Sequence, residues 1–195
     1  MAITSIKTGS SFTNLQKYND FLGPNAAYIP SSFESIATVT ATSGTSVTLS
    51  SIPSTYQHLQ IRWQAARNGS SNGQLNMRIN GDAGTNYAYH ALYGDGATVT
   101  ALGSASDTRI QYLGFVRGSS FDYKARGVID LHDYSSTTKN KTVRNFAGVD
   151  TNGAGTVWLT SGLWMNTAAV TSITFDLLGD TFNTTEFSLY GIKGA

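Results

Sequence analysis

The segment from Tyr56 to Arg67, YQHLQIRWQAAR, alternates regularly between apolar and polar residues. Leu59, Ile61, Trp63 and Ala65 occupy alternate positions, and the residues between them are polar. Because successive side chains of a β-strand point to opposite faces, this period of two predicts a strand with one buried, apolar face. Trp63 is the largest apolar group on that face, and we expect it to anchor the core.

Comparable alternation, interrupted by turn signals, continues from residue 34 onward with no helical pattern between the segments. Many short strands separated by turns rich in Gly, Asn and Asp are typical of sandwiches. The sequence therefore predicts an all-β protein, an antiparallel two-sheet β-sandwich of jelly-roll-like type. The ten predicted strands span residues 36–42, 45–51, 56–67, 75–79, 110–116, 123–131, 142–150, 156–165, 173–177 and 186–193.

The predicted strand 156–165 is apolar on both faces. Val157 and Leu159 point to one face, whereas Trp158 and Trp164 point to the other. Such a strand is either central in its sheet or covered by a partner. We therefore expect the two tryptophans to fill the core or a subunit interface, and we count both among the predicted interface residues.

Residues 1–33 have a different pattern, because Leu15, Tyr18 and Leu22 recur at helical spacing. A helix this short is not stable alone in water, so we expect it to pack on its own sandwich or on a neighbouring subunit. The chain thus divides into an N-terminal arm with a short helix or helical turn, residues 1–33, and a β-sandwich domain, residues 34–195. The predicted attachment residues of the arm are Leu15, Tyr18, Phe21, Leu22 and Tyr28.

Composition narrows the function classes further. Only 13% of the residues are charged and the net charge is +1, so no overall field attracts nucleic acid or a membrane surface. The absence of cysteine excludes disulfides and cysteine-based zinc sites. No apolar run approaches the roughly 18 residues of a membrane span. We therefore expect neither nucleic-acid binding nor membrane insertion.

The side chains that metal binding and catalysis require are scattered along the chain. His58, His90 and His132 have no partner at metal-ligand spacing except in Asp130–Asp133, DLHD, where we expect a solvated or salt-bridged edge. No serine lies in a G-x-S-x-G motif, and the low acid content disfavours a carboxylate pair for glycoside cleavage. We expect no metal, no cofactor and no enzymatic activity.

Tyr87, Tyr89 and Tyr93 lie between two predicted turns. Their rings have the shape to stack on sugar rings, and Asn86 and Asp95 would bind hydroxyl groups beside them. We expect the three tyrosines to pack in the core or at an interface, and we name them as possible ligand contacts as the alternative.

Four arginines, Arg62, Arg78, Arg126 and Arg144, fall on predicted polar strand faces. If their strands are neighbours, these side chains form a basic band. Because the high isoelectric point and interleaved aromatic residues of nucleic-acid sites are missing, we expect salt bridges with acidic groups of this chain or of a neighbour.

Several segments together resemble a widespread family of bacteriophage virion proteins. The resemblance implies a structural component of the virion, as capsid decoration, tail or tail-fibre protein, with other virion proteins as partners and no catalytic residues to assign. We expect a homo-oligomer, with a homotrimer as the specific prediction. The alternative is a receptor- or glycan-binding module at the phage tail that contacts a host surface glycan. The segments are SIPSTYQHLQIRW (51–63), NGDAGTNYAYHALYGDG (80–96), DYSSTTKNKTVRNFAGVDTNG (133–153), SGLWMNTAAVTSITF (161–175) and FSLYGIKG (187–194).

Overall fold

The computed structural model describes residues 32–118 and 123–193. The predicted N-terminal helix and the attachment residues Leu15, Tyr18, Phe21, Leu22 and Tyr28 lie outside this part of the chain. No helix long and apolar enough to cross a membrane occurs among the described residues. The twelve strands are β1 (Phe33–Ala41), β2 (Ser46–Leu49), β3 (His58–Arg67), β4 (Gly73–Ile79), β5 (Tyr87–Gly94), β6 (Val99–Asp107), β7 (Ile110–Val116), β8 (Ala125–His132), β9 (Lys141–Asp150), β10 (Gly155–Trp164), β11 (Ile173–Asp176) and β12 (Phe182–Ile192).

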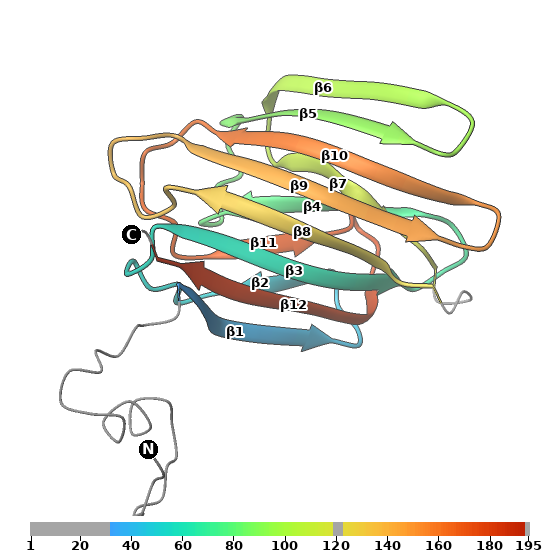
Figure 1. The fold of residues 1–195 in the computed structure, drawn as a ribbon, viewed down its shortest axis with the longest axis horizontal. Helices are drawn as coiled ribbons and strands as arrows, with labels where there is room; N and C mark the ends of the chain where they lie inside the picture. The colour runs from blue at the N-terminus through green and yellow to red at the C-terminus, as the bar shows by residue number, and fades with distance from the viewer. Residues whose placement is uncertain (1–31, 119–122, 194–195) are drawn as a thin grey trace, which may run out of the picture. The chain divides into compact units, whose positions relative to one another are not determined.

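Neighbouring strands pair antiparallel and form two sheets (Figure 1). The larger sheet has eight strands in the order β1-β12-β3-β8-β9-β10-β5-β6, and the smaller sheet has four in the order β2-β11-β4-β7. The smaller sheet lies behind the larger one in Figure 1 and packs on one of its faces. These observations confirm the predicted antiparallel two-sheet β-sandwich.

Eight of the strands have the arrangement of a jelly roll. The strands β1, β12, β3 and β8 are consecutive in the larger sheet, and β2, β11, β4 and β7 make up the smaller sheet. Along the chain these eight strands alternate between the two sheets, except where β4 and β7 follow each other in the smaller sheet. Two four-stranded sheets of this kind form the double-sheet jelly roll that the sequence predicts.

Two hairpins widen the larger sheet beyond the jelly roll. The hairpin β5–β6 follows β4 in the chain, and the hairpin β9–β10 follows β8. Together they extend the sheet from β8 in the order β9-β10-β5-β6, toward the top of Figure 1. Strand β6 is not among the ten predicted strands, because this edge strand alternates only between exposed and half-buried positions and has no apolar face.

The core lies between the two sheets and is built around one row of side chains. Trp63 is buried, as the sequence predicts, and its ring lies 6.5 Å from that of Phe187 on the adjacent strand β12. Phe187 in turn stacks on Phe175 of the smaller sheet, with ring centroids 4.1 Å apart. The residues that pair consecutively along this row of the larger sheet are Phe187, Trp63, Gly127, Ala147 and Trp158.

Candidate functional site

In the described part of the chain, one face of the larger sheet has no layer packed on it, and Figure 1 looks onto this face. We call it the open face. The smaller sheet packs on the opposite face, which carries the core. Of the eight large hydrophobic side chains exposed among the described residues, five lie on the open face, with exposed fractions of 45 to 70%. They are Leu92, Val99, Phe146, Val157 and Leu159.

Four apolar side chains on the open face form a continuous row, which we call the apolar row. Val128 pairs with Phe146, Phe146 with Leu159, and Leu159 with Leu92. Directly opposed side chains in a sheet lie about 5 Å apart, so the row crosses β8, β9, β10 and β5 without a break. A solvent-facing sheet surface normally carries polar residues, and a contiguous exposed apolar patch marks an interaction site.

The open face is hollowed on both sides of the apolar row. One hollow, of about 370 Å³, lies between Phe146 and Arg126, where Gly148 supplies no side chain. The other, of about 460 Å³, lies on the other side of the row and is lined by Leu159 and Arg144. The open face therefore has projecting side chains next to hollows, so a surface of complementary shape can pack against it.

Three arginines surround the apolar row. Arg62 pairs with Val128 at the end of the row, whereas Arg126 and Arg144 lie two residues from it on opposite sides. None of the three takes part in an ion pair within the described part of the chain. The predicted basic band thus forms from these three, but the salt bridges expected within the chain are not observed there. Salt bridges with a neighbour stay a prediction.

The fourth arginine of the predicted band lies elsewhere. Arg78 is on β4 in the smaller sheet, and its Nε donates a hydrogen bond to the carbonyl oxygen of Thr108 at 3.2 Å. On the open face, the Arg62 guanidinium lies 5.5 Å and 5.4 Å from the ring centroids of Phe33 and Tyr190. These cation–π contacts hold Arg62 toward β12 and β1, away from the middle of the apolar row.

The two tryptophans predicted at the interface lie in the core of this chain. Trp158 is fully buried and stacks on Tyr93, with ring centroids 4.3 Å apart. Trp164 is also buried, and its Nε1 donates to Oδ2 of Asp82 at 2.8 Å. The core is thus the alternative that is observed, and the assignment of Trp158 and Trp164 to an exposed interface is wrong. Strand β10 is central, as its two apolar faces predict, and its second apolar face belongs to the open face.

The tyrosines predicted as ligand contacts also pack inward. Tyr87 and Tyr89 are buried, because they lie on the core side of β5. The Tyr87 hydroxyl donates to the carbonyl oxygens of Ile79 and Asp82, and burial raises its pKa to about 12. Tyr93 is half-buried and its ring face is occupied by Trp158. Tyr87 and Tyr89 therefore pack in the core, which is one of the predicted alternatives, and a ligand contact by these two rings is wrong. A ligand contact by the half-buried Tyr93 stays a prediction.

Two of the three histidines lie close together. The rings of His58 and His132 lie 4.9 Å apart on the open face, and the Asp133 backbone N–H donates to Nδ1 of His58 at 3.1 Å. The Asp133 carboxylate pairs with Lys139 at 2.8 Å. Burial, with help from Arg144 and His58, lowers the pKa of His132. No group of three or more potential metal ligands occurs among the described residues, and the salt-bridged edge predicted for residues 130–133 is observed.

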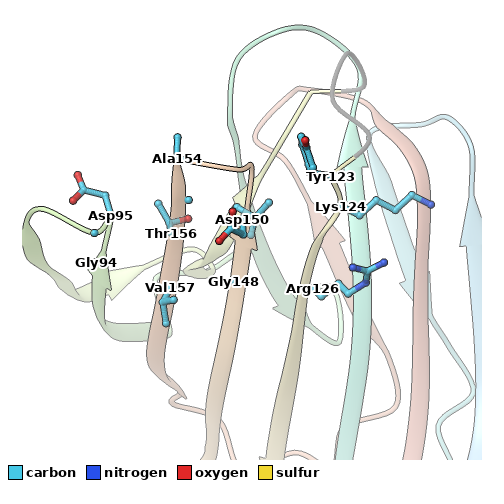
Figure 2. A pocket seen from close by; sticks show the side chains of 14 residues that line it. Gly94, Asp95, Tyr123, Lys124, Arg126, Gly148, Asp150, Ala154, Thr156 and Val157 are labelled. Atoms are coloured by element: carbon cyan, nitrogen blue, oxygen red, sulfur yellow. The ribbon is translucent and has the colours of Figure 1, made fainter.

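A cleft of about 680 Å³ opens at the end of the sandwich where β5 and β9 end and β10 begins. Figure 2 shows Asp95 on one side and Arg126 on the other, with Asp150 between them. Both carboxylates accept hydrogen bonds from backbone N–H groups of their own turns, and these bonds lower the pKa of Asp95. The groups that the cleft offers to a ligand are the two carboxylates, the exposed ring of Tyr123 and the nearby cations.

Comparison with protein-family models finds no match to this chain, and comparison with curated proteins finds none. Among solved structures, the chain is similar to a crystal structure of a protein of unknown function from Shewanella oneidensis MR-1. The two chains are 8% identical, with a TM-score of 0.22, over 84% of this chain and 81% of the other.

Proposed function

We propose that this chain is a structural component of a bacteriophage virion, as capsid decoration or as a tail or fibre protein, and that it assembles through the open face. The five sequence segments that resemble virion proteins support the proposal. The jelly roll also supports it, because viral capsid proteins are among the proteins with this architecture. The observation that carries it is the apolar row, which is exposed, continuous and bordered by arginines without ion-pair partners in the described residues.

The energy available from the open face suits a weak contact between two molecules in solution, which becomes strong only when it is repeated in an assembly. Burying a fully exposed Val, Leu or Phe side chain contributes about 1.5–3 kcal/mol. The five exposed side chains are already about half covered, so their complete burial contributes roughly 5 kcal/mol in total. Association in solution costs an amount of that order. Repeated copies on a particle surface compensate for this cost, because each added contact forms at high effective concentration.

The direct test replaces Phe146 by serine and measures incorporation into particles. Phe146 is 58% exposed, so the F146S variant keeps the thermal stability of the parent chain while each contact weakens about tenfold. T142S is the matched control, since Thr142 is exposed on the same face of the same strand. Normal incorporation of a folded F146S chain would contradict the proposal.

The N-terminal arm has its own test. Strand β1 begins at Phe33, so deletion of residues 2–30 removes no residue of the described sandwich. We expect the shortened chain to fold and to lose incorporation into particles. Unchanged incorporation would show that the arm is not an attachment segment.

A glycan-binding module at the tail is the second candidate, and the end cleft is the observation that favours it. Tyr123 is exposed there beside Arg126 and replaces the buried tyrosines of β5 as the ring that would contact a sugar. A Y123A chain would then assemble normally but fail to support adsorption to host cells. Immunogold labelling with antibody against residues 40–195 locates the chain, because label over the head favours decoration. Label at the tail tip fits either a tail protein or a glycan-binding module, and the adsorption of Y123A particles then distinguishes the two.

A further inference from the structure

We infer that the open face is a two-fold interface between two copies of this chain, with the apolar row lying along the symmetry axis. The inference rests on the proposed function in one respect, because both take the open face as the assembly surface. It goes further by naming the occupant as a second copy and by fixing which residues oppose each other.

The placement of charges on β8 points to this symmetry. Arg126 and Asp130 lie on the same face of β8, two residues before and two residues after Val128. A two-fold axis along the apolar row lies in the plane of the interface and perpendicular to the strands. It places each strand of one copy opposite the same strand of the other copy, running in the reverse direction. It therefore places Arg126 opposite the partner's Asp130, and Asp130 opposite the partner's Arg126. Arg126, which has no ion pair in the described residues, gains a carboxylate partner in this way.

The positions of large side chains and glycines on the open face are consistent with the same two-fold axis. On β9, Arg144 and Gly148 lie two residues to either side of Phe146, so Arg144 faces the partner's Gly148. On β5, His90 and Gly94 have the same relation to Leu92, so His90 faces the partner's Gly94. A long side chain thus meets a glycine on both strands. The hollow over Gly148 supplies room for this contact, and a surface that opposes itself in this manner is what a two-fold contact requires.

The size of the face also suits a second copy. Eight strands about 4.8 Å apart, with roughly seven residues of about 3.4 Å each, make a face of roughly 900 Å². A stable interface buries about 800 Å² per partner. Arg62 lies on the axis opposite the partner's Arg62, so like charges meet there. The cation–π contacts with Phe33 and Tyr190 hold this side chain near the periphery of the contact.

A two-fold contact makes a dimer, so the trimer predicted from the sequence would need a different surface. The decisive experiment is a charge exchange within one chain, measured by sedimentation equilibrium of the full chain over a range of concentrations. Each single variant, R126D or D130R, brings like charges together twice in the dimer. We expect each one to raise the dimer dissociation constant about tenfold or more.

The double variant R126D/D130R restores the opposed pair and should return the dissociation constant to within a few fold of the parent value. T48S serves as the control that leaves dimerisation unchanged, because Thr48 is exposed on β2 of the smaller sheet, away from the open face. Thermal unfolding confirms that every variant is folded. A parent chain that stays monomeric overturns the inference, and so does a folded double variant that dimerises no better than the single variants. An acidic partner of another kind would give the first result, because that partner is absent when the chain is measured alone.

Incorporation into particles separates this inference from the proposed function. If the parent chain is monomeric but F146S blocks incorporation, the two-fold contact is wrong and the role of the open face in the virion stands. If the chain dimerises and F146S prevents dimerisation without affecting incorporation, the two-fold contact stands and assembly through the open face is overturned.

Discussion

The indole ring of Trp63 occupies the space that a side chain at Gly127 would need. The two residues are direct cross-strand partners on β3 and β8. A Cβ atom on Gly127 would lie 2.7 Å from Cε2 and Nε1 of Trp63. The largest side chain on the inner face of β3 therefore lies flat against β8 only because its partner is glycine.

Substitution of Gly127 by alanine should destabilise the sandwich. The rigid indole of Trp63 has to move away from the added methyl group, and overpacking of this kind costs about 1–3 kcal/mol. Denaturant unfolding followed by tryptophan fluorescence measures the loss. G94A is the control, because a Cβ on Gly94 has its nearest neighbour, the Thr98 carbonyl oxygen, at 3.9 Å. Equal stability of G127A and the parent chain would show that the ring is not confined.

Truncation of two adjacent residues on β10 should change the free energy of unfolding by very different amounts. W158A removes a fully buried ring that stacks on Tyr93 and should cost about 3–5 kcal/mol of unfolding free energy. L159A removes an exposed side chain on the other face and should change the unfolding free energy by less than about 1 kcal/mol. Thermal or urea unfolding of the two variants side by side provides the check. Similar losses of unfolding free energy in W158A and L159A would contradict the conclusion that Trp158 faces the core and Leu159 faces solvent.

Asp82 should contribute to stability only while it is ionised. Hydrogen bonds from the Trp164 indole, Asn86 and the Gly84 backbone to the carboxylate lower its folded-state pKa below the ordinary 3.8. Because the folded pKa is the lower one, the stabilisation is complete above the unfolded pKa and is lost as the pH falls through the folded pKa. At pH 7, D82N should lower the unfolding free energy by about 1–3 kcal/mol, since the bonds to a charged acceptor are weakened.

The pH dependence distinguishes this carboxylate from other acidic groups. The stability difference between the parent chain and D82N should be constant above about pH 5 and shrink below about pH 4. Urea unfolding at several pH values measures it. A difference that stays constant down to pH 2 would mean that ionisation of Asp82 does not contribute.

Lys141 should be a structural cation. It is fully buried at the start of β9, and its Nζ donates to the carbonyl oxygens of Ser136, Lys139 and Thr167 at 2.7, 2.5 and 3.1 Å. Replacement by methionine leaves these acceptors without this donor, at a cost of about 3 kcal/mol or more. K139M is the matched control, because the exposed Lys139–Asp133 pair contributes at most about 1 kcal/mol. A K141M chain as stable as K139M would show that the carbonyl oxygens find other donors.

The sequence by itself determined the class of fold and the identity of the core strand. Alternation in residues 56–67 depends only on the geometry of one strand, so it correctly gives the buried face with Trp63. The same local rule identifies ten of the twelve strands or parts of them. It misses β6, because an edge strand with half-exposed faces leaves no apolar periodicity, and it does not identify β5, whose alternating tyrosines also suit a binding loop.

Only the tertiary structure decided which apolar face is covered. Strand β10 has apolar residues on both sides, and nothing local distinguishes the side of Trp158 from the side of Leu159. The smaller sheet packs on the face of Trp158 and leaves that of Leu159 exposed. Phe146 carries a weak sequence signal, as a lone aromatic residue on an otherwise polar strand face. Its role became visible when pairing placed it between Val128 and Leu159, because strand order is set by contacts between segments distant in the chain.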